Sequence, residues 1–251
     1  MDLGTGALLT VGLGLGLGGL CKGATGMGLP MVALPFMATF LGLPHSIAIL
    51  TLPVLVTNGW QVWQHRDRRD GCCFLFSLVI LALVGLVVGT LFLKTAPSAG
   101  LKLLFGLILA SYVVLRIARP AIDHGGRVGR LAPAVGLLSG LLQGATGIAA
   151  PVLATWLHAL RLDRDRYVFA ISTVYLLFGL FQLPVLMMAG LVNRGVIIES
   201  AFALVPVMAS MPLGSVIGRR LGQATFEAIV LVVIAAMALR FVWEGLAGTA
   251  A

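Results

Sequence analysis

Residues 19–30 read Gly-Leu-Cys-Lys-Gly-Ala-Thr-Gly-Met-Gly-Leu-Pro, and they interrupt an apolar stretch that extends from residue 3 to residue 42. Residues 140–151 read Gly-Leu-Leu-Gln-Gly-Ala-Thr-Gly-Ile-Ala-Ala-Pro and interrupt a second apolar stretch, 131–160. Glycine and proline at this density break helices. A shift of 121 residues superimposes the two Gly-Ala-Thr-Gly strings and the closing prolines, so the chain is a tandem duplication.

The duplication extends beyond the two interruptions. At the same shift Gln61 falls on Gln182, and with small gaps Gly85-x-x-x-Gly89 resembles Gly214-x-x-x-Gly218. We interpret the four glycines of this second pattern as helix contacts. The duplication divides the chain into a first repeat, residues 1–120, and a second repeat, residues 121–251, with the seam near 118–131. Together they form a single domain.

The composition places the chain in a membrane. Of its 251 residues 59% are hydrophobic and 10% are charged, whereas a soluble domain has about 25% charged residues. Apolar runs that can cross a core of about 30 Å recur, and they are continuous rather than alternating, which favours helices over a barrel. We therefore predict an all-α integral membrane protein. The predicted spans are 45–64, 72–93, 101–118, 167–190, 196–218 and 225–243.

The charged and cysteine residues fit this class. The net charge is +8, but the basic residues occupy short loops between spans, where they orient a membrane protein. We expect no nucleic-acid partner. The odd number of cysteines, with Cys72 next to Cys73, argues against a disulfide framework, so we interpret Cys21, Cys72 and Cys73 as packing residues. Trp60, Trp63, Trp156 and Trp243 lie near span ends and are expected to be interfacial anchors.

The orientation of the two repeats depends on the arms that flank each interruption. In the second repeat each arm reaches roughly 15–18 Å, about half a bilayer. If the arms form one broken span, the repeats are parallel, and the two sides of the membrane carry 9 and 7 basic residues. If they form a hairpin, the repeats are inverted. One side of the membrane then carries 12 basic residues and the other carries 4. The 12 lie in the loops 65–70, 116–130, 161–166 and 219–224.

The second division satisfies the positive-inside rule. We therefore predict inverted repeats, each with a broken or re-entrant helical hairpin plus three transmembrane helices, and both termini away from the cytoplasm. Two short full crossings in place of each hairpin would give the same sidedness, and this alternative stays open.

Matched helix breaks in the two halves of a membrane protein indicate a binding site. A helix that restarts inside the membrane exposes N–H groups with partial positive charge, which suit an anion. Pro30 and Pro151 fit the first turn of such a helix. Thr25 and Thr146 supply hydroxyls. Groups of this kind suit a small oxyanion or carboxylate.

Each candidate has a structural alternative. Glycine and threonine often serve only close helix packing, the two matched glutamines can simply join helices, and a lysine can extend to the interface. The first repeat carries Lys22 where the second carries a neutral amide, Gln143. The candidate substrate-binding residues are Lys22, Gly23, Thr25, Gly26, Gln61, Gln143, Gly144, Thr146, Gly147 and Gln182.

Catalytic machinery is not expected. The sequence has no G-x-x-x-x-G-K-[ST], G-x-S-x-G or H-E-x-x-H pattern, and no acidic residue lies deep in a predicted span. His45 and His158 lie at predicted helix ends and are interpreted as structural. We expect no enzyme activity, no metal site and no cofactor, and we favour a secondary carrier. The alternatives are an anion channel or uniporter for small carboxylates, and a non-transporting membrane scaffold.

The two interruptions also carry a resemblance. Residues 19–30 and 140–151 are similar to the signature of the TauE/SafE family, the sulfite exporter and sulfonate permease group, and the likeness covers nearly the whole chain. It implies a multi-pass protein of a bacterial inner membrane that transports small anions such as sulfite, sulfonates or sulfoacetate. It also places the site at Lys22, Gly23, Thr25 and Gly26, with Gln143, Gly144, Thr146 and Gly147.

The two copies differ within this likeness. The second copy has Ala149 where the first has Gly28, so the two half-sites are not expected to be equivalent. The sequence leaves the substrate, the direction of transport, the coupling ion and the oligomeric state open, a homodimer included.

Overall fold

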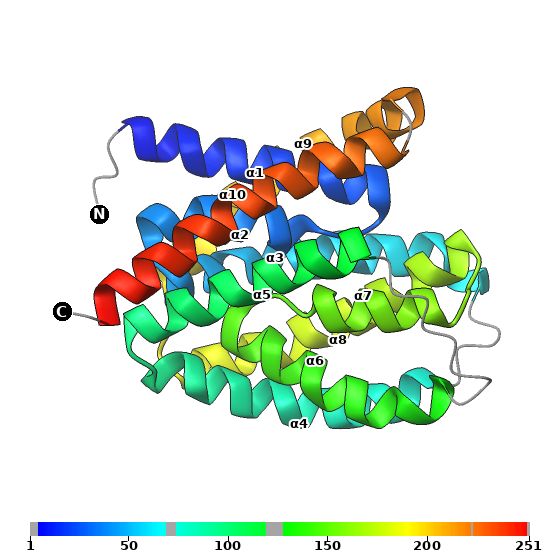
Figure 1. The fold of residues 1–251 in the computed structure, drawn as a ribbon, viewed down its shortest axis with the longest axis horizontal. Coiled ribbons are helices and arrows are strands. Elements are labelled where there is room, and N and C mark those ends of the chain that lie inside the picture. Colours follow the sequence, from blue (N-terminus) through cyan, green and yellow to red (C-terminus); the bar gives the residue numbers. More distant parts are fainter. Residues whose placement is uncertain (1–4, 69–73, 119–127, 222, 250–251) are drawn as a thin grey trace.

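The computed structural model describes residues 5–68, 74–118, 128–221 and 223–249, and every regular element in these ranges is a helix (Figure 1). Five residues discussed above lie outside these ranges: Cys72, Cys73, Arg69, Arg119 and Arg127. The seam near 118–131 lies partly outside them. The helices are α1 (Thr5–Thr25), α2 (Leu29–Leu41), α3 (Leu43–Gln64), α4 (Phe74–Thr95), α5 (Ser98–Ala118), α6 (Ala132–Thr146), α7 (Ala150–Ala159), α8 (Arg164–Met188), α9 (Arg194–Leu221) and α10 (Gln223–Thr249), with short 3₁₀ turns η1 (Arg66–Arg68) and η2 (Val128–Leu131).

The six predicted spans are confirmed. In the described residues α3, α4, α5, α8, α9 and α10 are long and apolar enough to cross a membrane. Large apolar side chains cover their outer faces, as in Phe76 at 77% and Met188 at 86% exposure. Such a surface suits lipid rather than water. The chain is therefore a multi-pass membrane protein.

The tryptophans behave differently from one another. Trp60, Trp63 and Trp243 are more than half exposed, as expected of residues near a bilayer interface. Trp156 is only 5% exposed and packs edge-to-face against Phe74. It is a packing residue, so its prediction as an anchor was wrong. The packing of α7 against its neighbours, which sequence position does not reveal, accounts for the difference.

Both apolar stretches are broken where the sequence predicts. The first break lies between α1 and α2, where Gly26 and Gly28 have φ of 82° and 94°; the second follows α6, where Gly147 has φ of 73°. Gly26 and Gly147 end α1 and α6, and Gly28 is the N-cap of α2. These left-handed conformations favour glycine. Helices α2 and α7 have 13 and 10 residues, or about 20 and 15 Å. They are too short to cross a core of about 30 Å.

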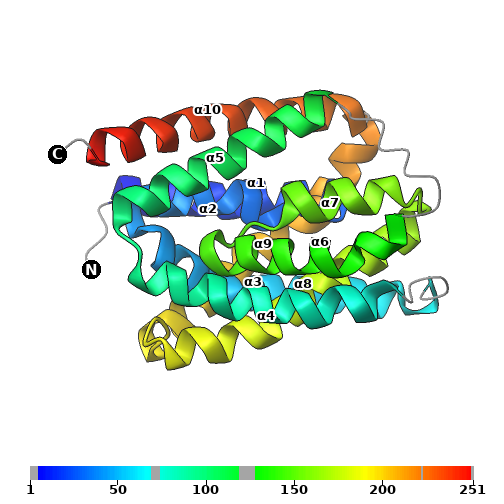
Figure 2. The same cartoon turned by 60° about the horizontal axis from the view of Figure 1, so that its bottom comes forward.

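The two broken segments enter the molecule from opposite ends. In Figure 1, α1 starts near the end that holds both termini, and α2 returns toward that end. Helix α6 starts at the other end, and α7 returns there, as the turned view in Figure 2 also shows. The ends of α3, α5, α7 and α9 and the starts of α4, α6, α8 and α10 lie at this second end. The helix ends that flank the four basic loops of the sequence are therefore at one end of the molecule.

Helices of one repeat pack mainly against helices of the other. Helix α1 packs against α9 and α6 against α4, while α3 pairs with α8 and α5 with α10. Glycines make the first two contacts close. A Cβ on Gly85 or Gly89 would overlap the backbone of α6, and a Cβ on Gly214 would overlap the backbone of α1. These glycines are helix contacts, as expected.

Candidate functional site

Lys22, in the last turn of α1, is buried in the protein. Its side chain is 3% exposed, and its Nζ donates a hydrogen bond to Asn58 Oδ1 of α3 at 2.8 Å. Asn58 Nδ2 donates to the carbonyl of Val54, which holds Oδ1 toward the ammonium. Within the part of the chain that the structure describes, no carboxylate lies within ion-pair distance of Lys22. The ammonium therefore has a neutral partner and does not extend to the surface.

The second repeat places Gln143 of α6 at the position of Lys22. Gln143 Nε2 donates to Gln182 Oε1 at 3.2 Å, and Gln182 Nε2 donates to the backbone oxygen of Gln143 at 3.4 Å. Both side chains are almost fully buried. Gln143 Oε1 is also buried and has no hydrogen-bond partner. Two candidate residues are thus in direct contact, and one of them carries an unsatisfied acceptor.

Gln61 and Gln182 have different partners although they are equivalent in the two repeats. Ser172 of α8 donates its hydroxyl to Gln61 Oε1 at 2.9 Å, which joins α3 to α8. The residue equivalent to Ser172 is Thr51, whose hydroxyl donates to its own helix at the carbonyl of Ile47. Gln182 bonds to Gln143 instead of Thr51. A direct hydrogen bond therefore joins α3 to α8 at Gln61. At Gln182, the equivalent position, no such bond to Thr51 is present.

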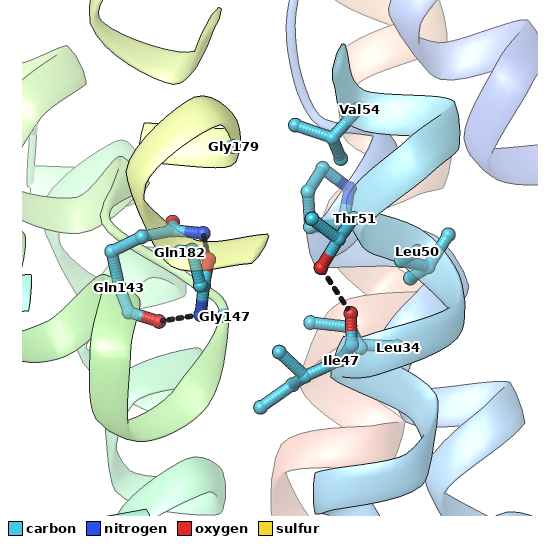
Figure 3. Close-up of a pocket in the computed structure, with 10 residues that line it drawn as sticks. Leu34, Ile47, Leu50, Thr51, Val54, Gln143, Gly147, Gly179 and Gln182 are labelled. Carbon is cyan, nitrogen blue, oxygen red and sulfur yellow. Dashed lines mark hydrogen bonds between the residues drawn. The ribbon is translucent and has the colours of Figure 1, made fainter. Parts of the chain in front are cut away.

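A pocket occupies this second position (Figure 3). Gln143 and Gln182 lie on one wall, and Thr51 lies across from them on α3. The pocket is small, with a cavity volume of about 10 Å³, and its lining includes Gly147 and Gly179. Gly179 stands where the first repeat has Asn58. A Cβ on Gly179 would meet the side chain of Leu55, so the second repeat has an apolar contact where the first has an amide.

The threonines of the two motifs form hydrogen bonds to nearby backbone. Thr25 Oγ1 lies 2.9 Å from the carbonyl oxygens of Cys21 and Met27, and Thr146 Oγ1 donates to the carbonyl of Leu142 at 2.7 Å. Thr146 is fully buried. To donate to an anion, either hydroxyl would have to leave its present acceptor.

The four motif glycines divide into two groups. Gly26 and Gly147 form the turns that end α1 and α6. Gly23 and Gly144 instead face neighbouring helices, since a Cβ on Gly23 would overlap the carbonyl of Met211 and a Cβ on Gly144 that of Leu86. The structure therefore gives Gly23 and Gly144 a packing contact.

Four residues of this region were missed by sequence reasoning: Asn58, Thr51, Ser172 and Gly179. Asn58 is an asparagine inside a predicted span, which is a signal for a buried polar contact. Thr51 and Ser172 fall on each other at the shift of 121 residues, and both carry a hydroxyl. Gly179 gives no signal of its own, because the sequence does not show that the side chain of Leu55 packs against it.

The family model described as sulfite exporter TauE/SafE matches residues 10–241. The chain belongs to the TauE/SafE sulfite exporter family. The match contains both broken segments and every residue of the polar contacts described above, and it confirms the resemblance that the two motifs carry. TauE/SafE is a family of membrane transporters. No curated protein and no solved structure matches the chain.

Proposed function

We propose that this TauE/SafE protein is a secondary transporter of small anions in the inner membrane. Its substrates are sulfur oxyanions or organosulfonates such as sulfite or sulfoacetate. Two inverted halves alternate their access around a central site made by the two Gly-Ala-Thr-Gly helix breaks. The observation that carries the proposal is the buried ammonium of Lys22, which has a neutral partner and sits at the first break.

An ammonium buried in a membrane protein is costly unless a counter-charge accompanies it. Asn58 accepts only one of the three N–H donors of Lys22. An anion that binds beside the ammonium supplies the missing charge and accepts the remaining donors. Charged groups inside membrane segments commonly mark substrate pathways for this reason.

The helix starts near the breaks support the same ligand class. Helix α2 begins after Gly28 and α7 after Ala149, and neither start has a side-chain cap. Their first N–H groups point out of the helix with partial positive charge. The arrangement favours a ligand that is negatively charged and rich in oxygen acceptors.

The inverted relation rests on three observations. The two broken segments enter from opposite ends of the molecule (Figure 1). The packing of α1 on α9 repeats in α6 on α4, and α3–α8 and α5–α10 each join equivalent helices of the two repeats. The junctions that carry most basic residues share one end, which we assign to the cytoplasm. Rocking of one half against the other then exposes the centre to each side in turn.

Uptake into proteoliposomes tests the proposal. The wild type is compared with Lys22→Ala, Thr25→Val and Thr146→Val for labelled sulfite, a labelled sulfonate and labelled acetate. Lys94→Ala is the matched control, because Lys94 is an exposed lysine at the end of α4. We expect the wild type and the control to move a sulfur-containing anion, and the three site variants to fold without transporting it.

The same vesicles separate a carrier from a channel. A carrier shows counterflow, in which unlabelled anion inside the vesicle accelerates entry of labelled anion, and a channel does not. Full transport by all three site variants would mean that the two motifs serve only helix packing. No uptake of any of the anions would contradict the proposed substrate class.

A further inference from the structure

The pocket between Gln143, Gln182 and Thr51 differs from the Lys22 site because its lining has no charged side chain and because it offers two side-chain oxygens to an occupant, Thr51 Oγ1 and Gln143 Oε1. Thr51 donates its one hydroxyl hydrogen to the carbonyl of Ile47, so its oxygen is available to a ligand only as an acceptor. Gln143 Oε1 is buried without a donor. Figure 3 shows these residues on opposite walls of the same pocket.

The hydrogen bonds between Gln143 and Gln182 determine which atom of the Gln143 side-chain amide has no partner. The backbone oxygen of Gln143 can only accept, so Gln182 must present its NH₂ group to it. Gln182 Oε1 then points to the side chain of Gln143 and requires a donor, which is Nε2. The atom of Gln143 that remains without a partner is therefore its oxygen. An unsatisfied acceptor at this depth costs about 1–3 kcal/mol, so an occupant that satisfies it is favoured.

Two further features favour a positive charge here. Gln143 occupies the position that Lys22 holds in the first repeat, so the equivalent place in the fold already accommodates an ammonium. The pocket also lies at the C-terminal end of α6, where Gly147 caps the helix. The carbonyls at a helix C-terminus carry partial negative charge, and such half-helix ends coordinate cations in transporters.

We propose that this pocket binds a small monovalent metal cation, with sodium as the test ion. Oxygen ligands of amide, hydroxyl and carbonyl type suit a hard cation. No residue that lines the pocket is titratable, so a bound proton would have no side chain to hold it. The bound ion supplies in the second repeat the positive charge that Lys22 supplies in the first. The pocket shares Gln143, Gly147 and Gln182 with the candidate anion site, but cation binding is measured without a substrate anion, so its outcome is independent of anion transport.

Thermal unfolding of the purified protein in detergent tests the site. Sodium chloride is replaced by N-methyl-D-glucamine chloride at constant ionic strength, with no other anion present. At a sodium concentration tenfold above Kd, we expect the wild-type Tm to rise by about 3–6 °C. Gln143→Leu and Thr51→Val each remove a ligand oxygen and should lose the rise. Gln143→Lys places a fixed ammonium in the pocket and should also be insensitive to sodium.

Ser139→Ala is the matched control. Ser139 also lies on α6 and has a buried oxygen without a partner, but it does not line the pocket. This variant should keep the full sodium-dependent rise. An equal Tm for the wild type in both salts overturns the proposal and leaves water as the occupant. A sodium-dependent rise that persists in Gln143→Leu or Thr51→Val overturns it as well, because the ion would then bind elsewhere.

Discussion

Replacement of Lys22 by methionine should have opposite effects on stability and on anion binding. Methionine keeps most of the volume and the unbranched shape of the lysine side chain, so the packing of α1 should survive. The change removes the buried ammonium and its 2.8 Å hydrogen bond to Asn58. A residue that only stabilises the fold would lose stability when it is replaced, whereas a residue retained for its ligand should not.

The size of both effects follows from the burial of the site. Loss of one partner of a buried, hydrogen-bonded charge pair costs about 2–5 kcal/mol of binding free energy, which is about 30- to 4,000-fold in Kd. In the ligand-free protein, Asn58 Oδ1 loses its donor at a cost of about 1–3 kcal/mol. Removal of an ammonium that is 3% exposed relieves a desolvation penalty of several kcal/mol. The ligand-free variant should therefore unfold at the same or a higher temperature than the wild type.

Thermal unfolding with an anion titration measures both quantities in one experiment. Sulfite and a sulfonate are titrated into wild type, Lys22→Met and Lys102→Met in detergent. Lys102 is the matched control, because it is a lysine of α5 with a carboxylate partner, Glu244, at 2.8 Å. The wild type and the control should show an anion-dependent rise in Tm, and Lys22→Met should lose it.

The opposite outcome is that Lys22→Met lowers the Tm of the ligand-free protein by several degrees and still responds to the anion like the wild type. Lys22 would then be a structural residue whose burial is compensated by Asn58 alone. A double variant, Lys22→Met with Asn58→Leu, removes both members of the pair. It should be more stable than Lys22→Met, because the Asn58 amide that has lost its donor is no longer present. It should still lack the anion-dependent rise in Tm.

Three other predictions concern the fold. Gly140→Ala places a Cβ against the backbone of α4 and should abolish the monodisperse protein in size-exclusion chromatography. Ser172→Ala leaves Gln61 Oε1 without its donor and should lower the Tm by several degrees, from a loss of about 1–3 kcal/mol. In intact cells and a background without native cysteines, an impermeant maleimide should label Lys94→Cys and spare Arg219→Cys. These residues lie in the last turns of α4 and α9, and the two helices end at opposite ends of the molecule (Figure 1).

Each of these predictions has a control and a contradicting result. Gly16→Ala adds a Cβ where no atom lies within 4 Å and should leave the elution profile unchanged; normal behaviour of Gly140→Ala would deny the close α4–α6 contact. Ser215→Ala removes a hydroxyl that donates only to its own helix and should change the Tm less than Ser172→Ala. Labelling of both cysteines from outside would contradict the proposed orientation.

The spans and the breaks are properties that the sequence alone determines. A continuous apolar run of about 20 residues must form a helix in a bilayer, because no water is present to satisfy its backbone. Gly26 and Gly147 end helices, and Gly28 precedes the start of one, through their own backbone freedom. Both features are local, so composition and spacing are sufficient to predict them. The duplication is equally visible, because it is a statement about the sequence itself.

The polar contacts were decided only by the tertiary structure. Lys22 meets Asn58, 36 residues away, and Gln61 meets Ser172, 111 residues away. Those pairings depend on how each helix is rotated and where it crosses its neighbour, and a hydrophobic pattern without polar periodicity does not specify either. The same is true of Gly23 and Gly144. Whether a glycine forms a turn or admits another backbone depends on which helix passes it, and helix crossing is a long-range property of the folded chain.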